Sequence, residues 1–364
     1  MNKRILDFIV CPQCKADFGL DIFYEEKGRI KEGLLACTSC KEVYPVIDFI
    51  PRIIKGIINT YPDFCRKYGF PINKGPAPDI RLSDTEKLNR KTMKSFGYQW
   101  TRAIFSQVIP KFEDSFLNYI YPIQRDFFCG KIGVDIGCGF GRHIYYAAKF
   151  GAEMVGIDFS AAINSAYNNT KELPNVHLVQ ADIYYLPLRN NYFDFIYSIG
   201  VLHHLPDPEK GFNALLPLLR PKGNISIWVY SKSRPIVNFT IESIRLITKR
   251  IPHKALYFLC IIFSFMEWLY VIIPYKFLNR LPVIRGLINK MVFKRIKTYA
   301  KYPFDVLTAD WFDRLSAPLR YYYNENDLKS WFTRANLKLV KISPTASYGW
   351  RVLGEKDYDY REKP

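Results

Sequence analysis

Two pairs of cysteines near the start of the chain have the spacing of metal ligands. Two residues separate Cys11 from Cys14, and two separate Cys37 from Cys40. Such spacing lets a tight turn aim two thiolates at one ion, and two turns complete a closed tetrahedral site that suits zinc. Four thiolates leave no open coordination position, so we expect a structural Zn²⁺. The segment is too short to fold on a core of its own, so metal binding would supply its folding energy.

A second chemical signal is the segment 132–141, where an apolar run ends in alternating glycines. Asp135 closes the run, and Gly137, Gly139 and Gly141 follow at every second position. Glycines tolerate positive φ and let the backbone approach a ligand closely. A turn of this kind after the first strand lies where doubly wound sheets bind their ligands. The spacing is DxGxGxG and differs from the GxGxxG of dinucleotide-binding turns.

Two more acids follow apolar runs. Asp158 comes after the expected strand 154–157, where a carboxylate suits the two hydroxyls of a ribose, although NAD enzymes place an acid there too. Asp182 comes after the expected strand 177–180, where it can accept the amino group of adenine. The three acids therefore predict one nucleoside site at the carboxyl edge of the sheet.

Apolar runs and helical patterns alternate along much of the chain, which predicts an α/β fold with a doubly wound, Rossmann-like sheet of seven strands. Residues 218–223 are expected to be a helix end followed by a glycine turn. The last two strands are close enough in sequence to form a hairpin. Expected strands begin at 132 and cover 154–157, 177–180, 192–198, 224–230, 337–342 and 348–353, with helices over 143–149 and 325–335.

This order of elements resembles the class I S-adenosylmethionine-dependent methyltransferases, in particular the type 11 branch that includes quinone methyltransferases. The matching segments cover roughly residues 125–232 and 325–354. They are, in order, VDIGCGFG, GIDFS, QADIYYLPL, FDFIYSIGVLHHL and LRPKGNISIWVY.

The resemblance implies S-adenosylmethionine as the cofactor and assigns parts of it to the chain. The glycine turn would line the methionine end, Asp158 would hold the ribose, Phe159 would flank the adenine, and Asp182 with Ile183 would complete the adenine pocket. The expected cofactor-binding residues are Asp135, Gly137, Cys138, Gly139, Gly141, Asp158, Phe159, Asp182, Ile183 and Ile199.

Two histidines, His203 and His204, follow the fourth strand at the expected acceptor side. Either can act as a base near neutral pH, and these are our catalytic candidates. The alternative, which we favour, is that one caps the next turn and the other lines the pocket without titrating. Methyl transfer from a sulfonium mainly needs alignment and a dry site, so a base is required only for a weak nucleophile.

The N-terminal 55 residues resemble the small zinc-ribbon family that activates methyltransferases as a separate protein. The likeness rests on the cysteines and on the runs ILDFIVCP and CKEVYPVIDFIP. It implies that the ribbon braces the catalytic domain or helps to present the substrate. We assign residues 56–124 to a linker with lid helices. In its segment 95–100, the aromatic residues around Gly97 suit either a lid over the cofactor or packing between domains.

Residues 233–320 form an insertion between the two parts of the expected core (125–232 and 321–356). Residues 255–273 are almost continuously apolar, just short of the ~20 residues that span a bilayer, and Pro274 is expected to end this helix. Cys260, Ser264 and Glu267 fall on one of its faces. Residues 281–297 predict a basic amphipathic helix. A substrate-capping subdomain and attachment to an anionic membrane are equal alternatives, ahead of a membrane-spanning helix.

The formal net charge of +18 over 364 residues indicates an anionic partner, either a membrane surface or nucleic acid. The leading hypothesis is a methyltransferase for a small-molecule or lipid-like acceptor. An RNA methyltransferase and a non-catalytic cofactor-binding scaffold are the alternatives. The first ten residues do not have the pattern of a signal peptide, so we expect a cytoplasmic protein, with peripheral attachment to the inner face of the membrane as a second possibility.

Overall fold

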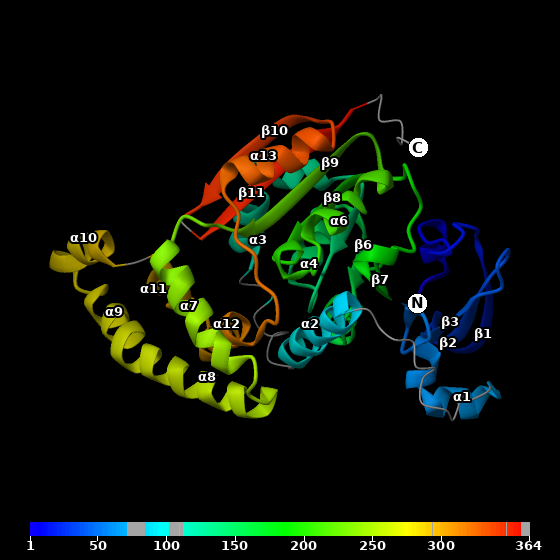
Figure 1. The fold of residues 1–364 in the computed structure, drawn as a ribbon, viewed down its shortest axis with the longest axis horizontal. Coiled ribbons are helices and arrows are strands. Elements are labelled where there is room, and N and C mark those ends of the chain that lie inside the picture. Colours follow the sequence, from blue (N-terminus) through cyan, green and yellow to red (C-terminus); the bar gives the residue numbers. More distant parts are fainter. Residues whose placement is uncertain (71–83, 102–108, 110–111, 293, 347, 358–364) are drawn as a thin grey trace.

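The computed structural model describes residues 1–70, 84–101, 109, 112–292, 294–346 and 348–357. One twisted sheet runs through the molecule, with helices on both of its faces (Figure 1). The N-terminal strands lie at one end of the view, and the helices of the insertion lie at the other.

Seven strands form the expected core in the order β7-β6-β5-β8-β9-β11-β10. The strands from β7 to β9 are parallel, and β11 is antiparallel to both of its neighbours. The chain reverses its direction of travel across the sheet at β5, and this switch point is where doubly wound sheets bind ligands. The strands are β5 (Ile132–Ile136), β6 (Glu153–Asp158), β7 (Val176–Ala181), β8 (Phe193–Ile199), β9 (Leu219–Tyr230), β10 (Leu337–Thr345) and β11 (Gly349–Lys356).

The N-terminal ribbon extends this sheet. Its strand β4 pairs in parallel with β7, with Arg52 opposite Gln180 and Ile53 opposite Ala181. The sheet therefore has eleven strands, and the expectation of seven is wrong because the edge of β7 is covered by the chain's own ribbon. The ribbon elements are η1 (Lys3–Asp7), β1 (Phe18–Glu26), β2 (Arg29–Cys37), β3 (Val43–Ile47) and β4 (Ile50–Ile53).

Side chains alternate between two cores on the two faces of the sheet. Ile136 and its neighbours pack with α6, α13 and the ribbon, whose Phe8 is fully buried. Phe195 and its neighbours pack with α3, α4 and α5. The ribbon thus shares a core with the strands from β5 to β11. The helices are α3 (Glu113–Ile120), α4 (Arg142–Lys149), α5 (Ala162–Thr170), α6 (Pro208–Asn213) and α13 (Glu325–Arg334).

Strand β9 begins earlier than expected. The prediction of a helix end and glycine turn at 218–223 is wrong, because a single 3-10 turn (Leu216–Leu218) leads directly into the strand. The pairing with β8 jumps from Phe193 opposite Leu219 to Phe195 opposite Asn224. The turn-forming residues are therefore absorbed in a bulge, where Lys222 has φ 61°.

The apolar part of the insertion is one continuous helix of 26 residues, His253–Leu278. Pro274 does not end it, because the proline lies in the first turn of α9, directly after a π-helical turn that accommodates its missing N–H. One face packs on α12, where Leu256 and Cys260 join the Phe312 cluster. Its parts are α8 (His253–Glu267), η8 (Trp268–Ile272) and α9 (Ile273–Leu278), flanked by α7 (Pro235–Thr248) and α12 (Phe304–Ser316).

The single basic helix expected at 281–297 is also wrong. Two shorter helices, α10 (Pro282–Met291) and α11 (Lys294–Tyr299), take its place. No residue of α10 is buried. Hydrogen bonds from Tyr275 to Asn289 (3.0 Å) and from Asn289 to Asn279 (2.8 Å) hold α10 beside α9. The apolar side of α10 therefore faces outward.

Helices α1 and α2 are among the described elements between the ribbon and the core. Helix α1 (Pro62–Tyr68) packs beside β1, where Tyr68 stacks on Phe23 with ring centroids 4.4 Å apart. Helix α2 (Asp84–Trp100) carries the aromatic segment 95–100 to the cavity described below.

Candidate functional site

A continuous cavity of about 900 Å³ lies at the switch point of the sheet. One part is bounded by the turns that follow β5, β6 and β7. The other part is bounded by helices of the insertion, and α2 contributes Phe96 and Trp100 to the wall. The size is that of a site for a drug-sized ligand, and here it extends from the expected cofactor turn into the insertion.

The turn after β5 exposes its backbone to the cavity. Gly137 and Gly139 have φ of 76° and 55°, in the left-handed region that favours glycine. A Cβ on Gly137 would come within 2.2 Å of Val201, whereas a Cβ on Gly139 would meet nothing within 4 Å. Gly139 thus leaves space on the cavity side for a ligand to approach the main chain.

Asp135 lies beneath this turn as a buried acid. Its side chain is 2% exposed, and Oδ2 has no hydrogen-bond partner among the described residues. Burial raises the pKa of Asp135 to about 8. A ligand that brings an ammonium group into the cavity would satisfy the free oxygen, and the methionine end of S-adenosylmethionine carries such a group.

Asp158, at the tip of β6, is already held by the protein. Oδ2 accepts the amide of Gly139 (2.8 Å), and Oδ1 accepts the amide and hydroxyl of Ser160 (2.8 and 2.7 Å). A carboxylate has about four acceptor positions, so about one remains for a ribose hydroxyl. Binding both hydroxyls through this carboxylate would require Ser160 to release it.

Asp182, after β7, is positioned by α2 and by its own turn. Its Oδ2 accepts the side-chain amide of Asn89 at 2.9 Å, and its Oδ1 accepts the amide of Tyr184 at 3.0 Å. Both carboxylate oxygens keep an acceptor position. Burial raises the pKa of Asp182 and of Asp158, but for each carboxyl the hydrogen bonds act in the opposite direction.

The structure brings nine of the ten expected cofactor residues to the cavity wall. Gly141 is the exception among them. With φ 88°, it starts α4, and a Cβ there would lie 3.1 Å from Ala166 of α5. Gly141 therefore serves close helix packing. The nine that line the cavity are Asp135, Gly137, Cys138, Gly139, Asp158, Phe159, Asp182, Ile183 and Ile199.

The two histidines lie in different environments. His204 lines the cavity, and its Nδ1 is 2.7 Å from the carbonyl of Leu319, which fixes the proton on Nδ1 and leaves Nε2 as an acceptor. Burial lowers the pKa of His204 to about 4. His203 is fully buried outside the cavity wall, neither of its ring nitrogens has a partner among the residues that the structure describes, and burial lowers its pKa well below the usual range.

The insertion side of the cavity contains an ion network. Glu267 of α8 binds Arg295 through two hydrogen bonds of 3.0 and 3.1 Å and accepts the indole N–H of Trp311 at 2.8 Å. Arg295 also pairs with Asp310, which Arg314 binds at 2.7 Å. These two arginines hold the pKa of Asp310 well below its usual range despite its burial. The network connects α8, α11 and α12 across the cavity wall.

Three cavity residues were missed by sequence reasoning. Arg234 is partly buried and forms no ion pair with a described residue, and burial and repulsion from Arg314 and Arg295 lower its pKa. Asp313 has an Oδ1 without a partner in the part of the chain that the structure describes. The third is Asn89. None of the three has a local sequence signal, because each reaches the cavity only through tertiary packing.

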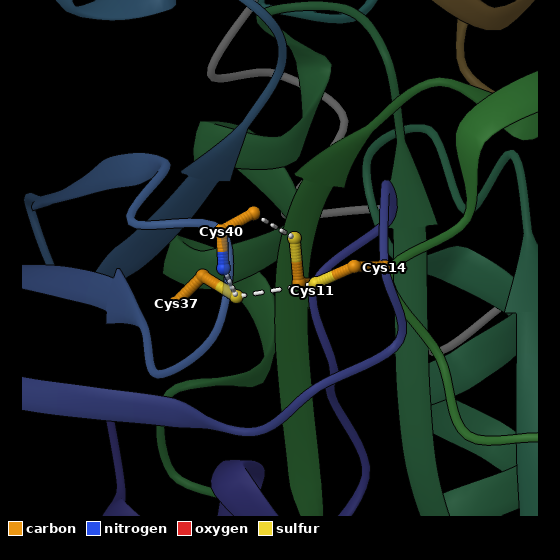
Figure 2. Close-up of side chains that lie close together, drawn as sticks. All are labelled: Cys11, Cys14, Cys37 and Cys40. Carbon is orange, nitrogen blue, oxygen red and sulfur yellow. Dashed lines mark hydrogen bonds between the residues drawn. The ribbon is translucent and has the colours of Figure 1, made fainter.

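The four cysteines converge between the two turns of the ribbon (Figure 2). Their sulfur atoms all lie within 4.8 Å of one another, with Cys11 and Cys40 3.6 Å apart and Cys14 and Cys37 3.4 Å apart. Zinc–sulfur bonds of about 2.3 Å in a tetrahedron place the sulfurs about 3.8 Å apart, so the cluster fits Zn²⁺. None of the four lines the cavity, as expected for a structural ion.

Arg52 connects the ribbon to the cofactor side of the cavity. The side chain is 1% exposed and donates to Gln180 (2.9 Å), Asn164 (2.7 Å) and the carbonyl of Ile47 (3.2 Å). Gln180 in turn donates to the carbonyl of Phe159 at 3.0 Å. A chain of two hydrogen bonds thus runs from β4 to a residue of the cavity wall.

Comparison with known proteins matches both parts of the chain. Residues 134–227 match the family model described as a methyltransferase domain, and residues 2–48 match the model described as a Trm112p-like protein.

Similarity to individual proteins is confined to part of the chain. Phosphoethanolamine N-methyltransferase 2 of Caenorhabditis elegans is 30% identical over 43% of this chain and 37% of its own length. Ubiquinone biosynthesis O-methyltransferase of Coxiella burnetii is 27% identical over 34% of this chain and 53% of its own. The tRNA U34 carboxymethyltransferase of Hahella chejuensis is 33% identical over 26% of this chain and 31% of its own length. The chain thus spans about a third to a half of the length of these relatives.

Proposed function

We propose that this chain, which carries a methyltransferase domain and a Trm112p-like domain, transfers a methyl group from S-adenosylmethionine to a small-molecule or lipid-like acceptor. One observation carries the proposal. A single cavity joins the acids and glycines after β5, β6 and β7 to a chamber bounded by the insertion. A donor and an acceptor can therefore lie in line without crossing bulk solvent.

The residues on the cofactor side fit S-adenosylmethionine. Asp135 offers a free carboxylate oxygen to the ammonium group, Gly139 leaves room beside the main chain, and Asp182 keeps two acceptor positions for the adenine amino group. Asp158 offers about one position to the ribose. The fit thus covers both ends of the molecule.

When bound, the cofactor supplies a methyl group already activated on a sulfonium. Because the donor would arrive already activated, the residues of the cavity would mainly align the two partners and exclude water. An acceptor hydroxyl or amine must also lose a proton. Asp313 Oδ1 and His204 Nε2 are acceptors to which no described residue donates, and the Tyr230 hydroxyl donates to the other Asp313 oxygen at 3.2 Å.

The chamber suits an acceptor with an apolar body and a negatively charged group. Trp228, Tyr230 and Val271 provide the apolar wall. Arg234 provides a guanidinium that lacks a carboxylate partner among the described residues, and repulsion from the neighbouring arginines makes an added anion favourable there. Phosphate and carboxylate groups both satisfy this chemistry.

Calorimetric titration of the zinc-loaded chain with S-adenosylmethionine tests the cofactor site. We expect binding, a loss of at least tenfold in affinity for Asp182→Ala, and no change for Asp63→Ala, which removes an exposed acid of α1. Transfer of labelled methyl groups into the organic-soluble fraction of a cell extract then tests the acceptor class. Absence of cofactor binding by the folded, zinc-loaded chain would exclude the proposal.

RNA methylation is the second candidate, favoured by the net charge of +18. RNA binding should then weaken steeply as salt is raised, because phosphate contacts release counterions. Label recovered in the RNA fraction of the same extract, and absent from the organic-soluble fraction, would favour this candidate over the first.

A further inference from the structure

The insertion presents an extended apolar surface. Of the 26 large hydrophobic side chains that are exposed among the described residues, nineteen lie between Ile236 and Met291. Val283 is 96% exposed, Ile236 81% and Phe239 74%. Single exposed hydrophobic residues are normal on any protein, but so many on the successive helices of one segment mark an interaction surface. We call the outward sides of α7, α8, α9 and α10 the apolar face.

The helices that form this face lie at one end of the molecule, away from the ribbon (Figure 1). The most apolar window of the helix His253–Leu278 has a mean hydropathy of 2.1 and is only 28% buried. Its outward side includes Phe258, Phe265 and Phe277. Length and composition alone would therefore allow this helix to cross a bilayer.

The packing of the other side of the helix His253–Leu278 argues against its crossing a bilayer. Leu256 and Cys260 are buried against α12, and Glu267 is bound to Arg295 and Trp311. Leaving this position would expose the ion network and place a carboxylate in hydrocarbon. The helix therefore suits an orientation along a surface, with one side on the protein and the other in the partner.

The positive charge of the insertion indicates which kind of partner this surface binds. Residues 234–301 contain thirteen lysines and arginines but only two acids, so this segment carries +11 of the net +18. Both acids are occupied, Glu242 by Arg245 and Tyr322, and Glu267 by the ion network. Exposed bases without an ion pair to any described residue flank the apolar face at both ends. They are Lys249, Arg250 and Lys254 at one end, and Lys276, Arg280, Arg285 and Lys290 at the other.

We propose that the apolar face docks on an anionic lipid bilayer, with the side chains of α7–α10 in the interfacial layer and the flanking bases on lipid headgroups. A bilayer offers apolar depth and negative charge together. A two-fold dimer would bring the same unpaired bases of both copies together without acids to neutralise them. RNA would leave the aliphatic side chains without a partner.

The apolar face also forms the back of the acceptor chamber. Val237 of α7 and Val271 of η8 line the cavity, while their neighbours Ile236 and Tyr270 face outward. Docking would therefore place the chamber at the level where lipid headgroups lie. This link rests on the proposed function, but docking itself requires no methyl transfer.

Flotation with vesicles tests the docking. The full chain should float with vesicles of phosphatidylcholine mixed with phosphatidylglycerol, and less with phosphatidylcholine alone. A triple variant, Phe258→Ser, Phe277→Ser and Val283→Ser, should lose at least tenfold in partition coefficient. Replacement of Arg280, Arg285 and Lys290 by Gln should lower the partition coefficient at low salt by about fivefold for each base removed. All six side chains are exposed, so the variants should fold.

Matched controls separate the outcomes. Leu339→Ser, at a 70% exposed residue of β10, and Lys329→Gln, on α13, should leave flotation unchanged. Failure of the wild-type chain to float with either vesicle would overturn the proposal, as would a dimer in solution that the triple Ser variant abolishes. Binding of S-adenosylmethionine should be the same in all variants, so a failure of docking is distinguishable from a failure of the proposed function.

Discussion

Arg52→Met tests whether the ribbon supports the cofactor site through Gln180. Methionine keeps most of the length and volume of the side chain but removes its donors. Three acceptors would then lose their donor: Gln180 and the carbonyl of Ile47, which are buried, and the side chain of Asn164, which is exposed. Hydrogen bonds to a charged group contribute about 1.5–3 kcal/mol each.

The removal of a buried charge makes the expected loss of stability smaller. Arg52 has no carboxylate within ion-pair distance among the described residues, and burial lowers its pKa, so the folded state carries a desolvated cation. Removing that charge recovers several kcal/mol. We expect a net loss of about 2–4 kcal/mol in the free energy of unfolding of the zinc-loaded chain, measured by urea denaturation. The freed Gln180 side chain should weaken its hold on Phe159, and affinity for S-adenosylmethionine should fall about threefold to tenfold.

Two comparisons make the result specific. Arg189→Met removes another contact between ribbon and core, which is exposed and does not reach the cavity, so stability should change by less than about 1 kcal/mol and cofactor affinity should not change. In a double-mutant cycle, Arg52→Met and Gln180→Met should couple by about 0.5–3 kcal/mol. Wild-type cofactor affinity in Arg52→Met, with no coupling to Gln180, would refute the reasoning.

Three further predictions address the acids and the metal. Because burial raises the pKa of Asp135 to about 8, affinity for the ammonium-bearing cofactor should rise from pH 6 to pH 8, by up to about tenfold per unit, and Asp135→Asn should flatten this profile in calorimetry. Cys37→Ser should lower the bound zinc, measured by atomic absorption, and the midpoint of thermal unfolding, whereas Cys65→Ser, at a buried thiol outside the cluster, should keep one zinc per chain. Glu267→Gln should lower the free energy of unfolding by about 3–5 kcal/mol and increase proteolysis of the insertion, because Arg295 loses its bidentate partner. Unchanged proteolysis would show that packing on α12 alone holds the helix.

Local sequence patterns determined most strands of the central sheet and most residues of the candidate cofactor site. The strands at 132–136 and 154–157 are apolar runs, and Gly137 and Gly139 are needed where the backbone adopts positive φ. Such signals lie within a few residues, so they can be read without knowing the fold. The four cysteines are a signal of the same local kind, because their spacing alone predicts the two metal-binding turns.

Only the tertiary structure decided how these parts combine. The pairing of β4 with β7, the reach of Asn89 and Arg234 into the cavity, and the outward side of the helix His253–Leu278 all depend on residues far apart in sequence. The hydrophobic period and the composition of a segment predict that its helix has an apolar side. They do not predict which part of the protein or which partner covers that side. Gly141 illustrates the limit, because a glycine that contacts a ligand and one that contacts another helix look the same in the sequence.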